Sequence, residues 1–135
     1  MKAFSFTTEY KVSVTYLVGG TVPKMLAYLK KKHGGKLPKV YSWDKEFTFG
    51  DDADTTDGYQ FHVNAPMGDG EVFYVWIAEP SAYLLSHETY HLAGDILFTR
   101  GIEYSYGSEE TYAYLMSSIF EVIFKKMRGK IPKRQ

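Results

Sequence analysis

The spacing of apolar and polar residues divides the first quarter of the chain into an extended segment and a helix. Residues 4–17 are rich in Thr, Val, Tyr and Phe, and the alternation in the second half of this stretch is the period of a strand. Gly19 and Gly20 end the segment. Thr21 is a suitable N-cap for a helix that runs to about His33, where two glycines follow. We therefore expect one strand and then one helix.

The same reading of the remaining sequence predicts three further strands and two helices. A short strand is expected over residues 39–43, and stronger strands over 59–64 and 71–78, where β-branched and aromatic residues gather. Helical spacing of apolar residues then predicts helices over about 81–99 and 108–127. The order β-α-β-β-β-α-α predicts an α+β fold, with a small twisted, mostly antiparallel sheet and helices packed on one face.

One short motif in the first of these two helices carries the candidate chemistry. It reads His87-Glu88-Thr89-Tyr90-His91, which is the pattern H-E-x-x-H. Two residues four apart on a helix differ by about 40° of rotation and roughly 6 Å of rise, so both imidazoles can reach one metal ion. Glu88 flanks that face, which is where a general base can touch a metal-bound water without binding the metal. The motif favours a zinc-dependent hydrolase.

A catalytic zinc site commonly has three protein ligands and one water, so a third ligand is needed. The acidic candidates that follow the motif are Asp95, Glu103, Glu109 and Glu110. Asp95 would lie about two turns from His87 on the same helix, too far along the axis to complete a tetrahedral site. The third ligand is therefore expected from outside this helix.

Glu110 is the better-placed candidate. The residues between His91 and Glu110 supply enough helix and loop to bring a second helix back beside the metal. Ser108 is a good N-cap, so Glu109 and Glu110 fall in a first turn, where the helix dipole favours an ionised carboxylate. Acids in a first turn are also common simply because they stabilise the helix, and this explanation stays open.

The motif, the 18-residue gap after it and the segment Glu110-Thr111-Tyr112-Ala113 resemble the gluzincin pattern of zinc metallopeptidases, whose second segment reads E-x-x-A. The stretch from about Leu84 to Ile119 is similar to small predicted metallopeptidases encoded by phages and mobile elements. The resemblance implies one Zn²⁺ per chain, with His87, His91 and Glu110 as ligands and Glu88 as the base.

The resemblance also implies a zincin-like arrangement of a backing helix, a sheet, an H-E-x-x-H helix and a helix that bears the third ligand. In such proteins an edge strand borders the cleft and pairs with an extended peptide. The edge is expected to be residues 72–77 or 59–64. A donor to the oxyanion of the reacting carbonyl is also expected. The candidates for this or another substrate contact are Tyr112, Tyr114, Tyr104 and His62.

Composition narrows the remaining possibilities. The 135 residues, 44% of them hydrophobic, suit a single domain over residues 1–135, with a basic tail over about 125–135. There is no Cys, and no signal peptide or membrane-length apolar run is recognisable, so we expect a cytoplasmic protein, or one of the virion or host cytoplasm if a phage encodes it. Sixteen basic and sixteen acidic residues balance, so a nucleic acid partner is not expected.

Two functions therefore stand after the sequence alone. The first is a zinc metallopeptidase that acts on a peptide or protein substrate. The alternative is a non-catalytic zinc-containing protein on the same scaffold, with a binding or structural role that is phage-associated. The intact Glu88 favours the first, because a purely structural zinc site needs no base.

Overall fold

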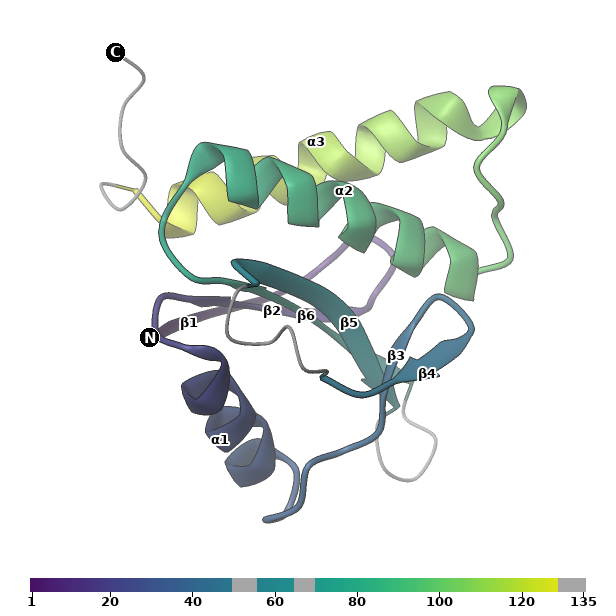
Figure 1. Ribbon diagram of the computed structural model, residues 1–135. Coiled ribbons are helices and arrows are strands. Elements are labelled where there is room, and N and C mark those ends of the chain that lie inside the picture. Colours follow the sequence, from purple (N-terminus) through teal and green to yellow (C-terminus); the bar gives the residue numbers. More distant parts are fainter. Residues whose placement is uncertain (50–55, 65–69, 129–135) are drawn as a thin grey trace.

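The computed structural model describes residues 1–49, 56–64 and 70–128 (Figure 1). The described elements in chain order are β1 (Lys2–Thr7), β2 (Ser13–Val18), α1 (Val22–Lys32), β3 (Val40–Ser42), β4 (Lys45–Phe47), β5 (Gly58–Asn64), β6 (Glu71–Ile77), α2 (Ala82–Thr99), a short 3₁₀ turn (Tyr106–Ser108) and α3 (Glu109–Lys126). The strands form one sheet in the order β1-β2-β6-β5-β3-β4. β2 and β6 are parallel and the other pairings are antiparallel, which confirms an α+β fold with a mostly antiparallel sheet.

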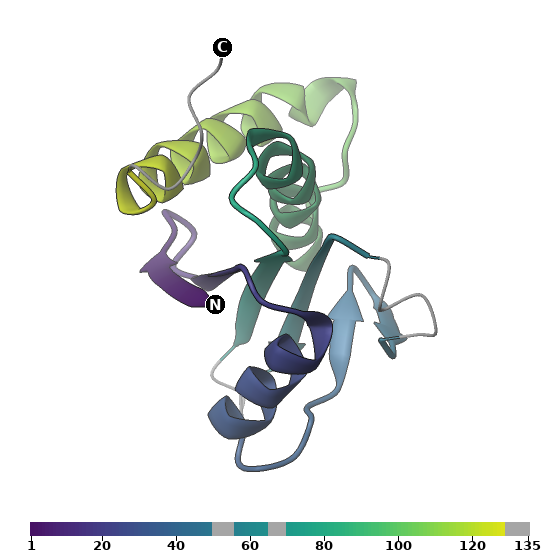
Figure 2. The same cartoon turned by 60° about the vertical axis from the view of Figure 1, so that its left-hand side comes forward.

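The helices cover both faces of this sheet, so the prediction of helices on one face was wrong. Side chains of β6 show why, because successive residues of a strand point to opposite faces. Phe73, Val75 and Ile77 belong to the core beneath α2 and α3, whereas Tyr74 and Trp76 belong to the core beneath α1. Figures 1 and 2 show α1 on one side of the sheet and the α2–α3 pair on the other. A central strand that is apolar on both faces needs a cover on each.

The first extended segment is a hairpin and not a single strand. β1 and β2 pair antiparallel, and the chain reverses between Thr8 and Val12, where the Thr8 amide donates to the Val12 carbonyl (3.0 Å). Lys11 adopts the left-handed region with φ 62°. The turn was missed because neither Gly nor Pro marks it. Strand β4, three residues long, was missed as well.

The predicted cleft edge is also corrected. β6 lies between β2 and β5, and β5 lies between β6 and β3, so neither predicted strand is an edge. Within the described residues, the outer strands of the sheet are β1 and β4. The physical reason is that the hairpins β1–β2 and β3–β4 add further strands on the two sides of the sheet. Each hairpin depends on a turn that contains neither Gly nor Pro, so the sequence does not indicate it clearly.

The three helices begin and end within about one residue of the prediction, because local signals define them. The side-chain hydroxyl of Thr21 accepts from the Lys24 amide at the start of α1, and that of Ser81 accepts from the Leu84 amide at the start of α2. α3 extends to Lys126, so the expected tail begins later than residue 125, and residues 129–135 lie outside the described part of the chain. No described helix has the length and apolar character to cross a membrane.

Candidate metal centre

The H-E-x-x-H motif lies in the first half of α2 and brings three potential ligands together. One donor atom from each of His87, Glu88 and His91 lies within 4.8 Å of the others. The two imidazole rings are 4.9 Å apart between centroids. Both histidines are exposed, whereas Glu88 retains only 8% of its accessible surface. Two exposed imidazoles beside one nearly buried carboxylate form a group that can hold a metal ion.

The position of Glu88 depends on a residue from the sheet. A Cβ atom placed on Gly58, the first residue of β5, would be 2.7 Å from Oε2 of Glu88 and 3.1 Å from the carbonyl oxygen of Trp76. The absence of a side chain at residue 58 therefore makes room for this carboxylate. Burial raises the pKa of the Glu88 carboxyl, and the nearby His87 opposes part of that rise.

Burial of part of its ring lowers the pKa of His91, and the neighbouring His87 lowers it further. Both effects favour the neutral imidazole, which is the form that binds a metal. Aromatic rings flank the pair: the Tyr83 ring stacks near His87 at 6.3 Å, and the Tyr90 ring lies edge-on to His91 at 5.9 Å. The histidines are thus open to solvent but bordered by tyrosines.

The opposite side of α2 is fixed to the sheet, and this determines which face of the helix presents the motif. Leu85, Leu92 and Ile96 are fully buried in the core between the helices and the sheet. The buried hydroxyl of Thr89 shares a 2.6 Å hydrogen bond with the Tyr16 hydroxyl of β2. Because Thr89 follows Glu88 directly, this bond holds the helix turn that carries the motif.

Asp95, the acidic residue rejected as a metal ligand, has a structural role. Its carboxylate has no exposed surface and accepts hydrogen bonds from the Trp43 amide (2.9 Å), the Gln60 side-chain amide (2.9 Å) and Nδ1 of His62 (2.8 Å). These partners come from the β3–β4 turn and from β5. The Trp43 ring lies against Gly94, where a Cβ would be 2.9 Å from Cζ2 of the indole. The network therefore fastens the β3–β4 hairpin to α2.

The structure brings two of the suggested substrate contacts together, since the Tyr104 and Tyr112 rings lie edge-on with 4.7 Å between their centroids, whereas His62 belongs to the Asp95 network. His62 is 5% exposed, bound to Asp95 and stacked on Tyr41, with 5.6 Å between the ring centroids. Tyr112 is 4% exposed, and its hydroxyl has no hydrogen-bond partner within the described structure. Burial raises the pKa of Tyr112, with smaller contributions from Tyr90 and Tyr104. Tyr104 and Tyr114 are exposed (54% and 70%), so their side chains are available to solvent.

Glu110 lies in the exposed first turn of α3 and is not part of the group formed by His87, Glu88 and His91. α2 continues to Thr99, and α3 then runs back beside it (Figure 1). The first turn of α3 therefore comes shortly after the C-terminal end of α2, whereas the motif lies in the first half of α2. Glu109 is exposed in the same turn. The assignment of Glu110 as the third ligand stays a prediction.

Comparison of the chain with protein-family models, curated proteins and solved structures gave no match. The candidate centre is therefore described by its own geometry. Sequence reasoning found its two histidines and its carboxylate, but missed Gly58 and the Asp95 network. Gly58 is separated from Glu88 by most of β5 and all of β6, and no local pattern marks it as a neighbour.

Proposed function

We propose that the protein is a zinc-dependent metallopeptidase in which His87 and His91 hold the metal and Glu88 is the general base. The observation that carries the proposal is the approach of two imidazole donors and one carboxylate to within 4.8 Å of one another on a single helix. Imidazole and carboxylate are donors that Zn²⁺ accepts in catalytic sites. The peptide substrate class rests on the resemblance of the motif to gluzincins.

Bound zinc would polarise the substrate carbonyl and lower the pKa of a coordinated water. The chain itself would contribute proton transfer, through Glu88. The Glu88 carboxylate lies beside both histidines, and packing against Gly58 restricts its position. A raised pKa suits a group that takes a proton from water and then delivers it to the leaving amine. The burial of Glu88 thus supports its role as base.

One observation favours the second candidate, a non-catalytic zinc-binding protein on the same scaffold. Within the described residues, the group around the motif contains no third ligand besides Glu88, because Glu110 is not among its members. If Glu88 itself completes the metal site, it is no longer free to act as a base. Experiment must therefore separate metal binding from hydrolysis.

The test compares the full chain with His91→Ala and Glu88→Gln. Zinc stoichiometry is measured by elemental analysis and affinity by calorimetry, and hydrolysis is measured with casein and a fluorogenic peptide mixture. The wild type is expected to bind one zinc, His91→Ala to lose it, and Glu88→Gln to keep it while hydrolysis falls by at least about 100-fold. His33→Ala and Glu79→Gln, both outside the motif, are the matched controls.

The outcomes distinguish the two functions. Absence of zinc from the wild type after zinc is supplied refutes the metal site. Zinc binding without any hydrolysis, or hydrolysis that Glu88→Gln does not change, refutes the peptidase with Glu88 as its base. Loss of zinc from Glu88→Gln would identify Glu88 as a ligand and support the non-catalytic protein.

A further inference from the structure

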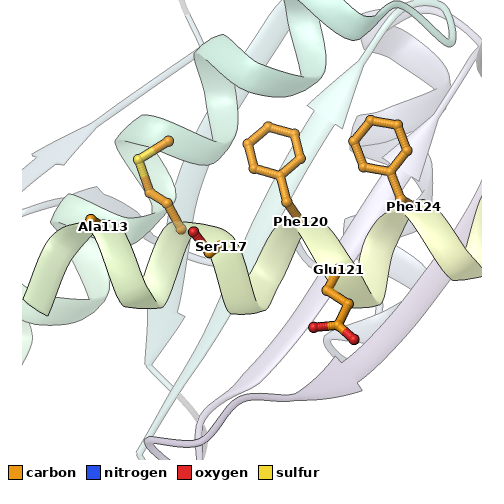
Figure 3. A pocket seen from close by; sticks show the side chains of 6 residues that line it. Ala113, Ser117, Phe120, Glu121 and Phe124 are labelled. Atoms are coloured by element: carbon orange, nitrogen blue, oxygen red, sulfur yellow. The ribbon is translucent and has the colours of Figure 1, made fainter.

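α3 has an exposed apolar side that the candidate metal centre does not use. Its buried side is formed by Tyr112, Leu115, Ile119 and Ile123. The other side holds a shallow groove lined by Ala113, Met116, Ser117, Phe120, Glu121 and Phe124 (Figure 3). Phe120 and Phe124 lie 5.6 Å apart between ring centroids, and Phe124 is 45% exposed. Apolar surface of this kind on a helix often marks an interaction site.

The residues along this side follow helical spacing and change in character from one end to the other. The stripe consists of Glu109, Ala113, Ser117, Phe120 and Phe124 of α3, at steps of three or four residues, and of Arg128, which lies in the turn two residues beyond the end of the helix. Its first half is acidic and then small, and its second half is aromatic and then basic. When two such stripes run antiparallel, the acidic end of each faces the basic end of the other, and each small residue faces an aromatic residue. The stripe is therefore complementary to its own antiparallel copy.

We propose that a second copy of this chain occupies the groove, through antiparallel pairing of α3 with α3 of the partner about a two-fold axis between Ser117 and Phe120. In this register, Phe124 lies over the Ala113 position of the other copy, and Phe120 lies over the Ser117 position. Each contact occurs twice, as a two-fold interface requires. Small residues opposite aromatic rings let the two helices approach closely.

Charge supports the same register. Glu109 at the start of the stripe meets Arg128 at the end of the partner stripe, again twice. Parallel pairing would instead place like charges together, which is unfavourable. Glu121 is already paired with Lys125 within the chain, at 3.0 Å. The end charges therefore select a second copy in the antiparallel direction over an unrelated apolar helix.

The expected dimer is weak. α3 has 18 residues and is therefore about 27 Å long. One pair of such helices buries less than the roughly 800 Å² per partner that is usual in stable complexes. We expect a dissociation constant on the order of micromolar and a dimer that forms as concentration rises.

The test is sedimentation equilibrium of the full chain and its variants from low micromolar to millimolar concentration, with circular dichroism as the check of folding. Phe124→Ser is expected to weaken the dimer by at least about tenfold, since a buried aromatic residue is lost twice. Glu109→Arg and Arg128→Glu should each weaken it a few-fold, and the double variant should restore it. Tyr114→Ser, a change at an exposed tyrosine outside the stripe, should leave it unchanged.

A wild type that stays monomeric throughout this range overturns the proposal. So does a dimer that Phe124→Ser does not weaken, because the contact would then lie elsewhere. Failure of the double charge reversal to restore association, with both single variants folded and weakened, overturns the antiparallel register. None of these measurements depends on zinc or hydrolysis, so the dimer and the proposed function are tested independently.

Discussion

Replacing Asp95 with alanine is expected to destabilise the fold by about 3–5 kcal/mol, because it leaves three buried or partly buried donors without an acceptor. The Asp95 carboxylate has no exposed surface and accepts from the Trp43 amide, the Gln60 side chain and Nδ1 of His62, all at 2.8–2.9 Å. Gln60 and His62 are themselves buried, so water cannot readily replace the lost acceptor.

The magnitude follows from the individual bonds. A hydrogen bond to a charged group contributes about 1.5–3 kcal/mol, and the three share one acceptor and do not add fully. Each buried donor left without an acceptor costs about 1–3 kcal/mol, and three such donors that partly relax give the same range. In a chain of this size, such a loss corresponds to a fall in the melting temperature of roughly 10–18 °C.

The assay is urea unfolding, followed in parallel by tryptophan fluorescence and far-ultraviolet circular dichroism. Trp43 is a local reporter, since its ring lies against Gly94 and 5.2 Å from the Phe98 ring. Asp44→Ala is the matched control, because this carboxylate is exposed in the same hairpin turn. A cost for Asp95→Ala below about 1 kcal/mol, or equal to that of the control, would show that the network does not hold the hairpin on α2.

Two further predictions concern the candidate centre. Gly58→Ala should lower the free energy of unfolding in urea by about 1–3 kcal/mol and reduce any hydrolysis, because its Cβ would displace the Glu88 carboxylate. The control is Gly107→Ala, which should be tolerated because a Cβ there meets nothing nearer than 3.9 Å. Equal effects of the two substitutions would count against the close packing of Gly58 on Glu88. Glu110→Ala should weaken zinc binding measured by calorimetry, and Glu109→Ala should not, because neighbouring residues in a helix point about 100° apart. The reverse result would show that the third ligand, assigned from the 18-residue gap after the motif, is wrong by one residue.

Local information accounts for what the sequence predicted well. The helix boundaries follow from caps, glycines and apolar spacing that lie within the helices or beside them. The approach of His87, Glu88 and His91 was predictable for the same reason, because one helix turn sets their separation. These three side chains lie close together without any contact from the rest of the chain.

Tertiary structure alone decided how that helix is placed and what surrounds it. His62 looked available for chemistry in the sequence, but the sheet brings it to Asp95, and the two are far apart in the chain. Gly58 and Glu88 meet because β5 and β6 fold beneath α2. The positions of α1 against one face and of α2 and α3 against the other depend on long-range burial, which a local pattern does not encode. The amino-acid sequence thus determined the motif and its helix, whereas packing between distant segments decided the position of the Glu88 carboxylate, the burial of His62 against Asp95, and which side of α3 remains exposed.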